Sequence, residues 1–174
     1  MHVLLVIFSI AFTGRANVPP FLSDATVNAL KETCRDVRKA LGDEYLTTLV
    51  SSVSRMKHTE NEIKTAKDIA LNNAQDINKG ILSKFLTAKD ASTAESRKNL
   101  DGYITDQAVK SLHEEIDIII DNPSYTIEER NNILDLIYSK TGIDIIRQHA
   151  ETIRFAQENI NEQLGEHYVN CYTA

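Results

Sequence analysis

The chain has 174 residues, 25 of them acidic and 19 basic, which gives a formal net charge of −6. A surface with this charge repels phosphate backbones and anionic headgroups, so nucleic acid is not expected as a partner. A chain of this length fits one domain with a substantial core. No apolar run in the sequence reaches the length of a bilayer span, so stable membrane insertion is not expected either.

The first residues look like a secretory signal peptide. They read MHVLLVIFSIAFTGRANVPP, in which the apolar run 3–12 precedes Gly14 and Ala16, small residues that signal peptidase accepts. This run is shorter than the roughly 20 residues that a membrane span needs. We therefore expect cleavage after Ala16, so that residues 1–16 are lost. The mature protein would be secreted and extracellular, with a single helical domain over residues 17–174.

The two cysteines, Cys34 and Cys171, are expected to pair. The oxidising route of a secreted protein favours a disulfide within the chain. The alternatives are two buried free thiols or a bond between two chains. The disulfide would fasten the C-terminal residues to an early helix. Because it closes a long loop, the chain-entropy model gives it a stabilisation of about 4–5 kcal/mol.

The fold class follows from the spacing of the apolar residues. They recur three and four positions apart, which is the period of a helix, and strand patterns are nearly absent. The sequence predicts an all-α protein. We expect an antiparallel bundle of five to six helices, because several apolar stripes in one chain must be buried against one another. The expected helices lie roughly over residues 24–41, 46–58, 60–85, 109–121, 127–138 and 143–164.

Local signals mark where helices begin and where they are interrupted. Two T-x-x-E capping boxes predict helix starts, Thr59 with Glu62 and Thr126 with Glu129. The polar stretch 87–102 (TAKDASTAESRKNLDG) predicts a connection with at most one helical turn. We expect this connection to be the most mobile or protease-sensitive part of the chain.

A family resemblance is carried by residues 112–139, which read LHEEIDIIIDNPSYTIEERNNILDLIYS. This segment resembles the nematode SXP/RAL family of secreted antigens, which includes anisakid allergens and carries a domain named as cation-binding. The likeness lies in a helix ending Asp-Asn-x-Ser, a hydroxyl-containing start with paired acids, and Ile and Leu at helical spacing. Pro19-Pro20-Phe21-Leu22 adds a proline-rich opening of the family's kind. The resemblance implies a secreted all-α protein recognised by host antibodies that binds divalent cations.

A candidate cation site lies in the same segment. Glu114, Asp117 and Asp121 fall at i, i+3 and i+7 on one helix face, and Asn122 follows. Asp117 and Asp121 are near a helix C-terminus, where carboxylates are unfavourable, and bound Ca²⁺ or Mg²⁺ would relieve this. The alternative, favoured by the residue pattern alone, is a solvated acidic face neutralised by Arg130 and nearby lysines.

The sequence carries no signature of catalysis. No G-x-S-x-G occurs, and the histidines follow no metal-ligand spacing. We therefore expect a protein that is not an enzyme, and no cofactor is expected apart from the candidate Ca²⁺ or Mg²⁺. Surface positions are expected for the histidines His58, His113, His149 and His167.

Two other binding functions remain open beside the cation. The first is an extracellular carrier of fatty acid or retinoid, a small lipid held in an apolar cavity of the bundle. Its expected lining is Ile63, Ile77, Ile81, Phe85, Ile116 and Ile153, for which core packing is the simpler role. The second is an interaction module that contacts a host protein or antibody through residues 87–102.

Overall fold

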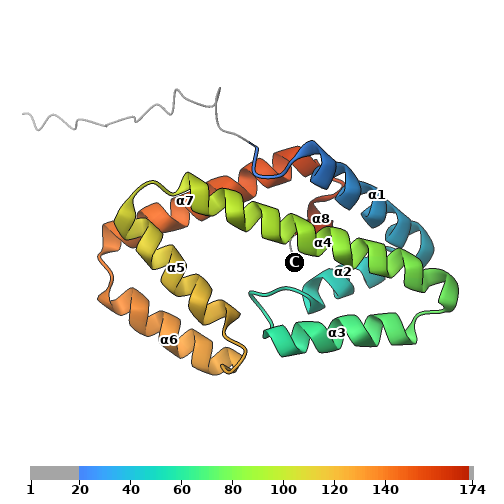
Figure 1. Cartoon of the computed structure of the whole chain (residues 1–174), viewed down its shortest axis with the longest axis horizontal. Helices are drawn as coiled ribbons and strands as arrows, with labels where there is room; N and C mark the ends of the chain where they lie inside the picture. The colour runs from blue at the N-terminus through green and yellow to red at the C-terminus, as the bar shows by residue number, and fades with distance from the viewer. Residues whose placement is uncertain (1–19, 173–174) are drawn as a thin grey trace, which may run out of the picture.

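The computed structural model describes residues 20–172, and all its regular structure is helical (Figure 1). The predicted signal peptide lies outside these residues. The all-α prediction is confirmed for the described chain, with eight helices instead of five to six; the antiparallel bundle stays a prediction. The helices are α1 (Asp24–Leu41), α2 (Asp43–Ser52), α3 (Glu60–Asn73), α4 (Asp76–Tyr103), α5 (Gln107–Asp121), α6 (Ile127–Lys140), α7 (Ile143–Leu164) and α8 (Val169–Tyr172).

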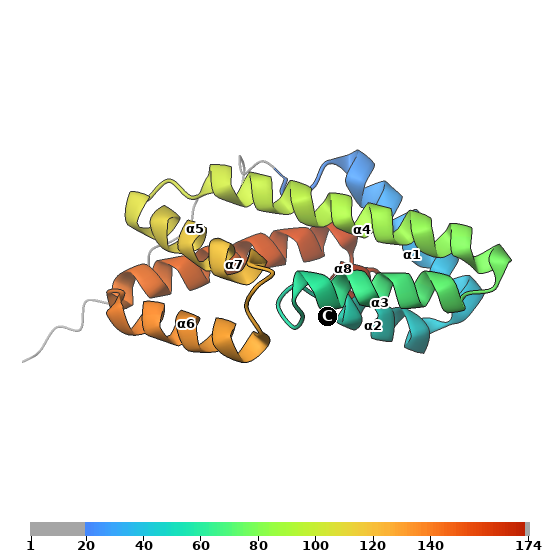
Figure 2. The ribbon, with the colours of Figure 1, turned by 60° about the horizontal axis from the view of Figure 1, so that its bottom comes forward.

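The long helix α4 runs along most of the molecule and joins its two ends. Helices α1, α2 and α3 lie at one end of it, and α5 and α6 lie at the other (Figure 1). Helix α7 starts beside α6 and runs back along α4, as the second view also shows (Figure 2). No helix in the described part of the chain is long and apolar enough to cross a membrane.

The buried apolar residues form two clusters that Ile145 of α7 connects. The larger cluster joins α1, α2, α4, α7 and α8, and its fully buried members include Leu30, Phe85 and Leu164. The smaller cluster joins α5, α6 and the start of α7 around Leu112, Ile116, Ile120 and Ile137. Ile145 packs against both.

The expected disulfide is present between Cys34 in α1 and Cys171 in α8, with their Cα atoms 6.0 Å apart. Both cysteines are fully buried. Lys89 of α4 holds the same C-terminal segment by donating from Nζ to the carbonyl oxygen of Tyr172 at 2.8 Å. The last helix is therefore fastened to α1 by a covalent bond and to α4 by hydrogen bonding.

The connection predicted over residues 87–102 is wrong, because these residues form the second half of α4. Their buried side chains continue the helical stripe of Leu82 and Phe85 through Lys89, Ser92, Ser96 and Leu100. The two serine hydroxyls donate to backbone carbonyls three residues earlier, at 2.7 and 2.9 Å. Because these hydroxyls are satisfied inside the helix, small polar residues occupy core positions here, and a polar composition does not mark a loop.

The long helix predicted over residues 60–85 is also divided. Its break falls at Ala74 and Gln75, whose backbone is extended, and Gly80 lies inside α4. Ile77, expected in the core, is 79% exposed. The preceding helix ends at Ser52 and does not continue to His58.

Both predicted capping boxes are confirmed. The backbone N–H of Thr59 donates to the Glu62 carboxylate at 2.7 Å, and that of Thr126 donates to Glu129 at 2.8 Å. In each box the threonine hydroxyl accepts from the backbone N–H three residues later. The backbone hydrogen bond from Thr59, aided by its hydroxyl, lowers the pKa of Glu62, and Thr126 does the same for Glu129.

Candidate functional site

The acidic residues of the candidate cation site contact two arginines. Arg97 of α4 donates to Asp117 at 2.7 Å and to Asp121 at 2.6 Å. Arg55, between α2 and α3, also hydrogen-bonds Asp121 and lies 3.6 Å from Asp117. Burial acts to raise the pKa of Asp121, but the two guanidinium groups outweigh it and hold this pKa below its usual value. The negative end of α5 is therefore neutralised by side chains from two other segments.

The remaining residues of the candidate cation site do not join this cluster. Glu114 is exposed, and the Asn122 Oδ1 accepts from the backbone N–H of Ser124 at 2.9 Å. Within residues 20–172, no group of three or more His, Cys, Asp or Glu side chains is arranged to hold a metal ion. Cation binding stays a prediction. At the position expected for the cation, Arg55 and Arg97 already supply positive charge to Asp121.

Arg130, expected to neutralise the acidic face, has a different role. Its side chain is buried, with 3% exposed, and Nη1 donates to the carbonyl oxygens of Arg55 and His58, both at 3.2 Å. Arg130 thus attaches the start of α6 to the connection between α2 and α3. Its contribution to the acidic cluster is indirect, because it holds the backbone of Arg55.

The surface position expected for all four histidines is wrong for two of them. His113 of α5 and His149 of α7 are buried, with 5% and 8% exposed. The His113 Nδ1 lies 3.1 Å from the His149 Nε2. Sequence spacing shows which residues share a face of one helix, since side chains four positions apart do so. It does not show that His113 and His149, 36 positions apart, meet between two helices.

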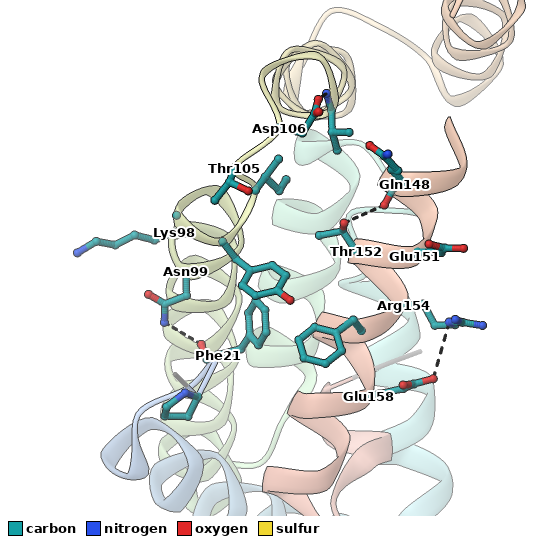
Figure 3. A pocket seen from close by; sticks show the side chains of 16 residues that line it. Phe21, Lys98, Asn99, Thr105, Asp106, Gln148, Glu151, Thr152, Arg154 and Glu158 are labelled. Carbon is teal, nitrogen blue, oxygen red and sulfur yellow. Dashed lines mark hydrogen bonds and ion pairs between the residues drawn. The ribbon is translucent and has the colours of Figure 1, made fainter. Parts of the chain in front are cut away.

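A groove of about 970 Å³ lies where the end of α4, the start of α5 and the middle of α7 come together (Figure 3). The residues before α1 form its remaining edge. Its lining consists of Pro20, Phe21, Lys98, Asn99, Gly102, Tyr103, Ile104, Thr105, Asp106, Val109, Gln148, Glu151, Thr152, Arg154, Phe155 and Glu158.

Three aromatic rings from three segments meet in this groove. Tyr103 of α4 and Phe155 of α7 are stacked, with ring centroids 5.4 Å apart. Phe21 contacts both edge-on, at 5.6 Å from Tyr103 and 6.2 Å from Phe155. Asn99 holds Phe21 in place by donating to its carbonyl oxygen at 2.9 Å. The chain has five Phe, six Tyr and no Trp, so three of its few large rings gather at one place.

The charged residues of the groove extend away from this aromatic floor. In Figure 3 the ends of Lys98 and Arg154 point outward from the rings. Arg154 also lies 3.9 Å from Glu158, and Asp106 accepts from the backbone N–H groups of Ala108 and Val109 as the cap of α5. The floor is thus apolar, while the polar groups lie at the rim.

The cavity lining predicted from the sequence does not form this groove. Phe85 and Ile116 are buried in the two core clusters, and Ile77 is exposed. Ile63, Ile81 and Ile153 are half-buried and pack against the larger core cluster. The prediction followed helical stripes, which identify core residues, whereas the groove lies where helix ends meet.

Comparisons of the chain with protein-family models, curated proteins and solved structures gave no match. The resemblance to the SXP/RAL antigens therefore stays an expectation.

Proposed function

We propose that this chain is a secreted, non-enzymatic protein that binds a small, uncharged and mainly apolar molecule in the groove between α4, α5 and α7. The observation that carries the proposal is the aromatic floor, in which the half-buried rings of Tyr103 and Phe155 line the groove and rest against the buried ring of Phe21. Rings that only filled the core would be covered by protein on every side. Ligand sites in proteins are mostly apolar clefts of roughly 300–1,000 Å³, and this groove lies within that range.

The charge distribution favours a neutral ligand over a fatty acid. A carboxylate held against the floor would need a basic partner directed toward it. The two basic residues of the groove, Lys98 and Arg154, are directed outward, and Arg154 is near Glu158. Of the two ligand classes expected from the sequence, retinoid alcohols therefore fit better than fatty acids.

The rim offers hydrogen-bonding groups for one polar end of such a ligand. Thr105, Gln148 and Thr152 line the groove beside the rings. The Thr152 hydroxyl donates to the backbone carbonyl oxygen of Gln148 at 2.8 Å. The lone pairs of the Thr152 hydroxyl oxygen therefore remain available as acceptors. A ligand hydroxyl could donate there while the apolar body rests on Phe155.

A titration with retinol and a fluorescent fatty acid tests the proposal. The decisive variant is Gly102→Phe, because a Cβ at Gly102 meets nothing within 4 Å and a large side chain would fill the groove without cutting into the core. Gly80→Phe is the matched control: Gly80 lies on the same helix, is equally unobstructed, and is outside the groove lining. We expect the unmutated protein and Gly80→Phe to bind retinol alike.

Gly102→Phe should weaken retinol binding at least about tenfold, since roughly 1.4 kcal/mol of lost contact is enough for that change. The fatty acid should bind more weakly than retinol. Equal retinol binding by the two glycine variants would contradict the proposal, as would an unmutated protein that binds neither probe.

Secretion is part of the same proposal and has its own test. The apolar run at residues 3–12 and the disulfide between Cys34 and Cys171 both support export into an oxidising compartment. When the full chain is expressed in a secreting eukaryotic cell, the protein in the medium should have a mass lacking residues 1–16. A full-length chain retained in the cell would contradict export.

A further inference from the structure

The buried pair His113–His149 lies directly behind the groove. His113 follows Val109 by one helical turn on α5, and His149 precedes Thr152 by three residues on α7. Val109 and Thr152 both line the groove, and residues three or four apart share a helix face. The imidazole contact therefore joins the two helices that form opposite walls of the groove.

The charged groups around the pair come from α4 and from α5 itself. From α4, the Asp101 Oδ1 lies 3.4 Å from the His113 Nε2, but the geometry is not that of a hydrogen bond, and this buried nitrogen has no hydrogen-bond partner. From α5 itself, Asp117 acts on His149 and is in turn paired with Arg97 and Arg55.

Helix α6 contributes no charge to this surrounding at neutral or mildly acidic pH. Its residues beside α5 are Ile137 and Tyr138, which pack in the smaller core cluster. Burial raises the pKa of Tyr138, so that its phenol stays neutral.

The pair can hold one proton more easily than two. With one positive charge, His113 can donate from Nδ1 to His149 and present Nε2–H to Asp101. With two, both facing nitrogens carry protons, their hydrogen bond is lost, and two like charges lie about 3 Å apart in a buried site. The second proton therefore pushes α5 and α7 apart.

We propose that protonation of the His113–His149 pair weakens ligand binding in the groove, so that ligand is held at neutral pH and released at mildly acidic pH. This inference rests on the proposed function, because it describes the regulation of the same groove. Separation of α5 from α7 moves Val109 and Thr152, which belong to opposite walls, and the ligand loses its fit to the aromatic floor.

The titration of His149 agrees in direction with this behaviour. Burial, reinforced by His113 and opposed by Asp117, lowers the pKa of His149 below its ordinary value of 6.5. The unfolded chain thus binds this proton more readily than the folded one. The stability that comes from the neutral ring is present above about pH 6.5 and is lost as the pH falls toward the lower, folded pKa.

The test measures the Kd of retinol at pH 7.5 and pH 5.0 for the unmutated protein, His149→Phe and His167→Phe. His167 is exposed and is not part of the groove lining, so its variant controls for loss of a histidine. We expect the Kd to rise roughly tenfold on acidification in the unmutated protein and in His167→Phe, as linkage to one proton allows over this interval. In His149→Phe it should change less than about twofold.

A second variant keeps the test decisive if His149→Phe fails to fold. Asp101 is about half exposed, so Asp101→Asn should fold, and it removes the carboxylate that lies 3.4 Å from the His113 Nε2. The pH at which affinity is lost should then move downward. A midpoint unchanged in Asp101→Asn, or a pH dependence equal in the unmutated protein and His149→Phe, would overturn the switch. Absence of retinol binding at pH 7.5 would instead overturn the proposed function.

Discussion

At the residue scale, the least expected side chain is Lys89. It lies in the core of α4 with 7% exposed, donates to the Tyr172 carbonyl oxygen, and has its Nζ 5.6 Å from the centroid of the Tyr172 ring. Burial lowers its pKa from 10.5 to about 8, against the attraction of Asp90 and with the repulsion of Lys67. A single charged residue therefore helps to position the C-terminal helix at a cost in desolvation.

The pH dependence of stability tests this assignment of Lys89. Between pH 8 and 10.5 the unfolded chain keeps a proton that the folded chain has lost, so the free energy of unfolding should rise across this range. Relative to Lys89→Met, which cannot titrate, the gain should reach up to about 3 kcal/mol. Urea unfolding at several pH values measures it, and parallel curves for the two proteins would show that Lys89 has an ordinary pKa.

The acidic cluster gives a second prediction at this scale. Replacing Arg55 and Arg97 together by glutamine leaves Asp117 and Asp121 without their positive partners, which should lower the free energy of unfolding by about 1–3 kcal/mol. Millimolar Ca²⁺ should then raise the Tm of this double variant more than that of the unmutated protein, since free carboxylates accept a hard cation.

The control for this calcium effect adds Asp117→Asn and Asp121→Asn to the double variant. This protein should show no calcium-dependent rise in Tm, because the ligand oxygens have lost their charge. A calcium effect equally large in the unmutated protein would mean that the arginines do not compete with a cation, and would support the cation site expected from the sequence.

At the element scale, α4 decides the architecture, because it links the two ends of the molecule (Figure 2). Helix α4 contains two glycines, Gly80 and Gly102, in a sequence that otherwise favours a helix. Neither has a positive φ. Gly42, between α1 and α2, differs, because its φ of 90° is a conformation that side chains disfavour.

Substituting two of these glycines should give opposite effects. Gly80→Ala should raise the free energy of unfolding by about 0.5–1 kcal/mol, because alanine loses less conformational freedom in a helix and its Cβ meets nothing within 4 Å. Gly42→Ala should lower it by about 1 kcal/mol through backbone strain. Urea unfolding measures both, and a destabilising Gly80→Ala would argue that α4 is not continuous there.

What the sequence predicts well in this chain is local. Helices α1, α5 and α7 follow from their apolar spacing, and α3 and α6 begin at capping boxes whose partners are three residues apart. The second half of α4 escapes this reasoning because Ser92 and Ser96 occupy core positions that an apolar pattern would need. The groove escapes it as well, since Phe21, Tyr103 and Phe155 come from three distant segments.

At the scale of the whole molecule, the disulfide joins the first helix to the last. It links residues 137 positions apart and acts together with the contacts of Tyr172 with Lys89 and Ser96 to hold the short helix α8. The two ends of the described chain are thereby held to one core. Near the first end, the backbone of Phe21 is held by hydrogen bonds with the side chains of Asn99 and Asn159. The geometry of the groove thus depends indirectly on the overall closure of the chain.

Removing the disulfide should destabilise the whole protein. Cys34→Ala with Cys171→Ala is expected to lower the free energy of unfolding by about 4–5 kcal/mol on the chain-entropy model. Thermal unfolding followed by circular dichroism measures the change, with reductant added to the unmutated protein as an independent comparison. A Tm unaffected by both treatments would mean that the bond constrains neither the folded nor the unfolded chain.

The central claim, that the aromatic floor binds an uncharged apolar ligand, is tested most directly by NMR of the isotope-labelled protein with unlabelled retinol. Contacts between ligand protons and the ring protons of Tyr103 and Phe155, the two half-buried rings of the floor, are the predicted result. Contacts confined to other aromatic residues, such as Tyr45 or Tyr138, or no contacts at a retinol concentration that saturates binding, would contradict it.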